Sequence, residues 1–283
     1  MELTFHEIKN IAHIAHRYDL NHILIGYLDK WLEPHFAHLL DYDYEEWLYV
    51  AWQFGLEEQY LTLANHLAVH CEINDRNELL VPSTQGQVFF PSAFPPHTIF
   101  LIHICRATAL DDIFFMVRAW IEEALSSITC RLPCGIQEQI LCSARNSHGL
   151  LGYLLRHGLF PMLSDSARET RSVRRIFEIM MSPELKDTLR IGGTNCEHDA
   201  ACSLAKAVME GVESLAGKLS WAVDGEMLKA IRRNGASRGL PLSEAKIPAR
   251  LVGLTKTLGM KDEVKDKVDS DVKIRVKEEP MSE

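Results

Sequence analysis

The sequence has no long apolar run and no export signal. Its N-terminus, MELTFHEIKN, lacks the basic segment and the apolar stretch of a secretory signal peptide. Nothing in it approaches the roughly 18 consecutive apolar residues that span a membrane, and the apolar run at 99–104 is interrupted by His103. From these absences we expect an intracellular protein of the cytoplasm, the nucleus or both.

Paired cysteine motifs are also absent. The seven cysteines are odd in number and irregularly spaced, so we expect reduced thiols that are mostly buried. Thiolates and imidazoles are zinc ligands, but the candidate set lacks the tight C-x-x-C pairs that indicate a structural zinc site. We therefore expect no metal at this set, which comprises Cys130, Cys134, Cys142, Cys196, His198 and Cys202.

The sequence contains neither a nucleophile elbow nor a glycine-rich phosphate loop. Gly192 and Gly193 are only a turn signal. Ser147 and His148 are adjacent, and neighbours on a helix do not face each other. We therefore expect no catalytic residue and no cofactor, and we predict that the chain is not an enzyme.

Basic charge is scarce. The formal net charge is −9, which argues against direct contact with nucleic acid. Residues 1–60 hold eleven acidic residues and only three basic ones, so this end could attract a basic partner, although a solvated acidic surface is the interpretation we favour. A small basic cluster is interpreted as a solvated helix face because no aromatic residue interleaves with it. It comprises Arg168, Arg171, Arg174 and Arg175.

Most of the chain carries apolar residues at helical spacing. This spacing predicts helices at 4–17, 20–32, 43–54, 56–70, about 97–129, 135–157, 170–181, 199–221 and 225–233. Asp19 is expected to cap the second helix and Pro34 to stop it. Gly55 and Gly158 suit the positions just after helix ends.

The second predicted helix has the clearest apolar stripe, at the spacing of one buried face. The stripe comprises Leu20, Ile23, Leu24, Tyr27, Leu28, Trp31 and Leu32. Residues 79–81 and 88–90 flank several turn formers and predict a small β-hairpin near 79–90. From 240 to 283 apolar periodicity fades and charges alternate, which predicts a disordered tail. The fold class is therefore mainly α, a multi-helix array.

His66 and His70 lie four residues apart on a predicted helix, so both imidazoles share one face, where a metal could bind. No Glu follows His66 in the zincin arrangement, and no third ligand is evident. We therefore interpret these residues, and likewise His13 and His16, as ordinary surface or helix-end histidines.

Residues 3–34, LTFHEIKNIAHIAHRYDLNHILIGYLDKWLEP, resemble the last two helices of a BTB/POZ domain. The following DYDYEEWLYVAWQFGLEEQYLTLANHLAVHCEIN is similar to the same region of large fungal BTB-domain-containing proteins, and the resemblance extends in outline to about 235, including GLFP at 158–161. It implies three regions: a BTB-like helix pair at 1–33, a helical region at 34–239 and the tail at 240–283.

A BTB domain has a β-sheet and further helices before the region of resemblance, whereas Met1 here lies almost at the penultimate helix. We therefore expect the sheet and the usual dimerisation surface to be missing, as in a truncated paralogue or an incomplete gene model, and we do not carry the family's self-association over to this chain. The apolar face of residues 5–32 is then expected to pack on residues 43–70 or to remain partly exposed.

The resemblance implies a non-enzymatic module that binds other proteins as an adaptor or scaffold. The alternative is a transcription-linked nuclear regulator whose tail is modified. An enzyme with an unrecognised helical active site ranks last.

In the tail, Val276-Lys277-Glu278-Glu279 matches the consensus for attachment of a ubiquitin-like modifier, an aliphatic residue before Lys and an acid two residues after it. Short motifs also occur by chance, so an ordinary charged tail is the other interpretation. We predict that Lys277→Arg removes the modified forms of the chain on a denaturing immunoblot from cells. Lys273→Arg, outside the consensus, is the control and should leave them; an unchanged ladder with Lys277→Arg contradicts the prediction.

Overall fold

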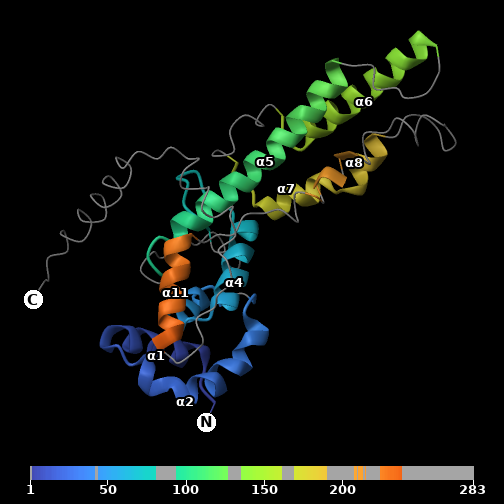
Figure 1. Cartoon of the computed structure of the whole chain (residues 1–283). Coiled ribbons are helices and arrows are strands. Elements are labelled where there is room, and N and C mark those ends of the chain that lie inside the picture. The colour runs from blue at the N-terminus through green and yellow to red at the C-terminus, as the bar shows by residue number, and fades with distance from the viewer. Residues whose placement is uncertain are drawn as a thin grey trace, which may run out of the picture. The chain divides into compact units, whose positions relative to one another are not determined.

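The computed structural model describes residues 2–41, 44–80, 94–126, 135–160, 169–189, 207–208, 210–212, 214 and 224–237. In this part the chain is mainly α-helical, as the sequence predicted (Figure 1). None of the described helices combines the length and the apolar character needed to cross a membrane. The chain divides into two compact units, Met1–Leu242 and Ser243–Glu283, and the second lies outside the described residues.

The first helix, α1 (Phe5–Tyr18), begins with a capping box: the Thr4 hydroxyl accepts from the Glu7 amide, and the Glu7 carboxylate accepts from the Thr4 amide. It ends at Asp19, whose φ of 54° is left-handed and whose amide donates to the Ala15 carbonyl. The prediction that Asp19 caps the next helix is therefore wrong. A short polar side chain tolerates this conformation, so Asp19 ends α1, and Leu20 precedes α2 (Asn21–Leu32).

Pro34 stops the second α-helix as predicted, since α2 ends at Leu32. It lies in the first turn of a 3-10 helix, η1 (Glu33–His38), that continues directly from α2. A first-turn position needs no amide donor, so proline is tolerated there.

The next two helices, α3 (Trp47–Gln53) and α4 (Glu57–His70), pack against each other, and α1 packs on α3. The four residues predicted to point inward from α3 are all fully buried: Trp47, Val50, Ala51 and Phe54. Gly55 follows α3 in a left-handed conformation, with φ of 68°, as expected. The packing of α1 on α3 confirms the expected cover for the first part of the apolar face at 5–32.

Far along the sequence, α11 (Gly225–Ser237) returns to these helices and contacts α2, α3 and α4 (Figure 1, orange). It extends beyond the predicted end at 233. The closest approach is between backbones, because a Cβ atom placed on Gly55 would lie only 2.1 Å from the Gly235 nitrogen. The Arg232 guanidinium binds Glu57 through two contacts of 2.7 Å, and the Asn234 amide donates to the Trp52 carbonyl at 2.8 Å.

A second core lies among α5 (Thr98–Ser126), α6 (Ile136–Arg156), α7 (Val173–Met180) and α8 (Pro183–Thr188). Its buried apolar residues include Leu110, Phe114, Leu150, Tyr153 and Ile176. The Tyr153 hydroxyl is 2.6 Å from both the Ile179 carbonyl and the Ser182 hydroxyl, so it joins α6 to the α7–α8 junction. The sequence did not predict α8, which Ser182 caps.

The predicted hairpin near 79–90 does not appear in the described part. Leu79 pairs instead with Ile73 in an isolated antiparallel bridge across a tight turn. Residues 81–93, which include the second half of the predicted hairpin, lie outside the described residues. So do the tail at 240–283 and most of the helix predicted at 199–221.

The glycine pair gives a sharp test of the α11 contact. Gly55→Ala should lower the free energy of unfolding by about 2–5 kcal/mol, because the new methyl group meets the Gly235 backbone and the left-handed conformation disfavours any Cβ. Urea denaturation followed by circular dichroism measures the change.

Gly26→Ala is the matched control. Gly26 lies inside α2 with nothing within 4 Å of an added Cβ, so the same change should stabilise by about 0.5–1 kcal/mol. Equal effects of the two substitutions would contradict the close approach at Gly55.

Candidate interaction surface

The stripe on α2, predicted to form one buried face, is only partly buried. Leu28 and Leu32 are buried, whereas Ile23 is 59% exposed and Tyr27 is 58% exposed. The prediction of a single buried face is therefore wrong. The physical reason is that α1, η1 and α11 cover the side of α2 that carries Asn21, Leu28 and Leu32, and Ile23 and Tyr27 point away from that side.

The exposed Ile23 and Tyr27 and the half-buried Trp31, spaced four residues apart on α2, form a row that we call the α2 ridge. The Tyr27 and Trp31 rings stack with their centroids 5.5 Å apart. Single exposed apolar side chains are ordinary. Apolar side chains that follow one another along one helix face form a patch of the kind that marks a binding surface.

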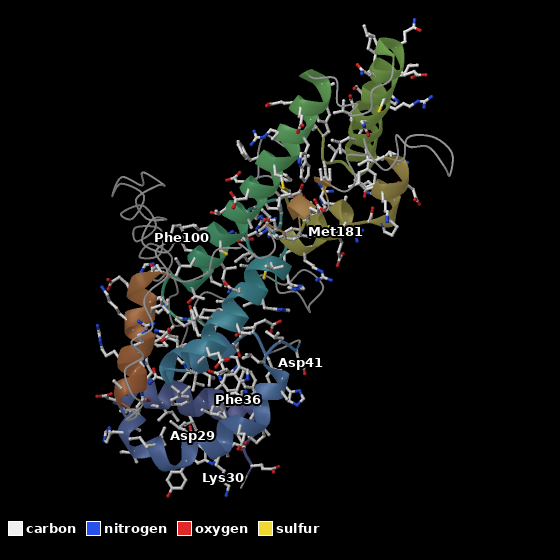
Figure 2. All side chains as sticks on the ribbon, turned by 45° about the vertical axis from the view of Figure 1, so that its right-hand side comes forward. Asp29, Lys30, Phe36, Asp41, Phe100 and Met181 are labelled. Carbon is white, nitrogen blue, oxygen red and sulfur yellow. The ribbon has the colours of Figure 1, made fainter. Side chains whose placement is uncertain are left out.

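Charged residues border the α2 ridge. Asp29, Lys30 and Glu33 are exposed on α2 and at the start of η1, and Figure 2 shows Asp29 and Lys30 on the lowest helix of that view. Two acids against one base give this border a mildly negative charge. The border therefore favours a partner surface that carries basic residues around an apolar centre.

Buried contacts hold the α2 ridge in place from beneath. The Asn21 side chain donates to the Gln53 carbonyl at 3.1 Å, and its oxygen accepts from the Gln53 side chain at 3.0 Å. The Asn21 side chain also donates to the Ser237 hydroxyl of α11 at 3.3 Å. These bonds fix the start of α2 on α3 and α11, so the helix that carries the α2 ridge is held in place.

An aromatic cluster fixes the other end of α2 through η1. Phe36 lies with its ring centroid 5.8 Å from that of the buried Trp47, and Phe5 stacks on both Tyr44 and Trp47. Aromatic pairs at these separations add stability beyond their buried area. The surface is thus presented by packed helices rather than by a loop.

The strongest charge centre in the described part is buried, and we call it the Arg106 junction. The Arg106 guanidinium, on α5, donates to the carbonyls of Glu169 and Arg171, the latter at 2.7 Å. Arg171 in turn pairs with the Glu169 carboxylate at 2.6 Å and donates to the His157 carbonyl at the end of α6 at 2.7 Å.

Burial shifts the pKa values of two groups at the Arg106 junction, and both groups stay in their protonated forms. Burial lowers the pKa of Arg106, the Glu169 carboxylate opposes this shift, and the guanidinium stays protonated at neutral pH. Burial raises the pKa of the nearby Cys71, so its sulfur remains a thiol, which is a poor nucleophile. The arrangement holds chain segments together.

The Arg106 junction was not predicted from the sequence. Arg171 was interpreted as part of a solvated helix face, and that interpretation is wrong, because Arg171 precedes α7 and binds Glu169 and the end of α6. Arg174 and Arg175 do lie on an exposed face, where both pair with Glu178. A lone Arg106 within an apolar helical stripe was the one available signal.

The two histidine pairs considered in the sequence lie on α4 and on α1. The His66 and His70 rings stack on α4, with centroids 4.1 Å apart. On α1, His13 stacks on Tyr49 and His16 contacts Trp52, both with exposed side chains. The described part holds no group of three or more His, Cys, Asp or Glu that could bind a metal.

Only some of the other residues singled out in the sequence lie within the described part. Cys142 is buried in α6, and the other five members of the predicted cysteine–histidine set lie outside the described residues, as do Arg168 and Lys277. The Ser147 hydroxyl donates to the Ser143 carbonyl at 2.7 Å, one turn back on α6, while His148 points to solvent. The expectation that Ser147 and His148 do not face each other is thus confirmed.

The Arg106 junction should be costly to remove. Arg106→Met leaves two carbonyls without their charged donor, so we expect a loss of about 2–5 kcal/mol in the free energy of unfolding. Arg118→Met is the control on the same helix, because Arg118 is exposed; its loss should stay within about 0.5 kcal/mol. Urea denaturation measures both, and similar losses would contradict the role of Arg106.

No family model, curated protein or solved structure matches the chain. The resemblance to BTB/POZ helices therefore stays a prediction from the sequence.

Proposed function

We propose that the chain is a non-enzymatic protein–protein interaction module, an adaptor or scaffold of the kind that the BTB/POZ resemblance implies. The observation that carries the proposal is the α2 ridge. It presents the exposed Ile23 and Tyr27 beside the half-buried Trp31, on a helix that buried contacts hold on α3 and α11.

The composition of the α2 ridge suits binding energetics. Tyrosine and tryptophan dominate the residues that carry most of the energy in protein interfaces, and an apolar centre with a polar rim is the usual arrangement. Tyr27 and Trp31 are already stacked on each other, so little side-chain freedom is lost when a partner covers them.

The described residues also favour binding over catalysis. The buried charge centre at Arg106 is engaged by backbone carbonyls, and the nearest thiol, Cys71, stays protonated. Partner recognition needs neither a pocket nor an activated nucleophile, and the exposed α2 ridge supplies the apolar area that recognition does need.

The test is a change of the α2 ridge that leaves its support intact. Ile23→Asp combined with Tyr27→Ser should reduce the recovery of bound proteins at least tenfold, because interface anchors of this kind contribute about 2 kcal/mol or more each. Quantitative affinity capture of the full chain from cells, followed by mass spectrometry, measures the recovery.

Phe115→Ser is the matched control. Phe115 is an apolar residue of α5 that is 70% exposed and lies away from α2 in the sequence. The control should retain the proteins that the parent chain retains, and circular dichroism should show equal helix content for all three chains. If parent, double variant and control retain the same proteins, the α2 ridge is not the binding surface and the proposal loses its support.

A further inference from the structure

The first half of α6 turns its largest apolar side chains to solvent. Ile136, Ile140 and Leu141 are each more than half exposed, and Ala144, one turn after Ile140, is exposed as well. A surface helix ordinarily directs such residues toward the core. Apolar side chains that adjoin one another on an exposed helix face form a patch of the kind that marks an interface.

The buried side of the same turns is small and polar by comparison. The buried residues of α6 in this stretch are Cys142, Ser143, Asn146 and Ser147, and its larger buried residues begin only at Leu150. The usual distribution of an amphipathic helix is therefore reversed in this half of α6. The apolar area that a contact could bury lies on the side that faces solvent.

Two opposite charges lie along one edge of this apolar face. Glu138 and Arg145 are both exposed, and within the described part neither forms an ion pair. Seven residues make nearly two full helical turns, so the two side chains leave α6 in nearly the same direction, one above the other. The edge thus carries an acid at one level and a base at a level two turns away.

We propose that the chain forms a twofold-symmetric dimer in which the exposed faces of two α6 helices pack antiparallel. A twofold axis between antiparallel helices brings the same edge of both helices together and sets each level above the axis against the matching level below it. Glu138 of one copy then faces Arg145 of the other, and this contact occurs twice. Near the axis, the large Ile140 of one copy lies beside the small Ala144 of the other.

The charges of α6 favour a second copy of the chain as the partner. The chain as a whole has a formal net charge of −9, which repels another copy at a distance. On α6, however, Glu138 is the one acid, against Arg145 and Arg156. One helix face buries less than the roughly 1,600 Å² of a standard interface, so we expect a weak, reversible dimer with a dissociation constant in the micromolar range.

Sedimentation equilibrium of the full chain over a range of concentrations tests the proposal. The parent chain should show a reversible monomer–dimer equilibrium. Ile140→Asp should weaken it by about tenfold or more, because a charge then enters the apolar centre of the interface. Phe115→Asp is the matched control, since Phe115 is an exposed apolar residue of α5; it should dimerise like the parent, and circular dichroism should show equal helix content.

Charge reversal tests the antiparallel pairing itself. Glu138→Arg and Arg145→Glu should each weaken self-association by about threefold or more, because each dimer then holds two contacts between like charges. A mixture of these two variants should form a mixed dimer as readily as the parent chain dimerises, because both of its contacts again join an acid to an arginine. Sedimentation with one variant carrying a fluorescent label measures the mixed dimer.

Three outcomes would overturn the proposal: a chain that stays monomeric, a dimer that Ile140→Asp leaves unchanged, or variants that pair no better in the mixture than alone. Loss of the dimer in Ile23→Asp/Tyr27→Ser, with the dimer retained in Ile140→Asp, would place self-association on the α2 ridge and overturn it as well. The proposal does not depend on the interaction function proposed for the α2 ridge, which affinity capture tests separately.

Discussion

The approach of Gly235 to Gly55 is the contact on which the N-terminal helices depend. A Cβ atom at residue 55 would collide with the Gly235 backbone, so α11 can lie on the turn at residue 55 only because that residue is a glycine. Once the backbones meet, Arg232 reaches Glu57 and Asn234 reaches the Trp52 carbonyl. Bringing together residues so distant in sequence has an entropic cost that the contacts must offset, so a steric barrier at the crossing would weigh directly against this packing.

The same contact determines which surface the chain presents. With α11 in place, the Ser237 hydroxyl meets Asn21, so the start of α2 is held on both α3 and α11. One side of α2 is then committed to packing and the other, with the α2 ridge, faces solvent. The exposed row is a consequence of how α11 packs rather than of a weak apolar pattern in α2 itself.

The Arg106 junction does a similar task for the second group of helices. A buried guanidinium is expensive to desolvate and stabilises only when its donors are well used. Here the Nη2 of Arg106 donates to the carbonyls of Glu169 and Arg171, whereas its buried Nε has no hydrogen-bond partner among the described residues. Beside it, the Ile73 amide donates to the Thr170 carbonyl at 3.0 Å. Four segments therefore meet at one short stretch before α7: the end of α4, α5, the end of α6 and α7 itself. The stretch has no regular structure of its own, so these polar contacts substitute for helical hydrogen bonds.

The sequence by itself determined the helical class, the approximate limits of most helices in the described part and the inward residues of α3, because these depend on apolar spacing. It also determined the left-handed glycines at 55 and 158, because these depend on local backbone preference. It did not determine that Asp19 ends a helix, that Leu79 pairs with Ile73, or that Ile23 and Tyr27 in the apolar stripe of α2 face solvent. Those outcomes depend on partners far away in the chain. Apolar spacing indicates that a helix face can be buried, but only the tertiary arrangement decides which part of that face another helix covers.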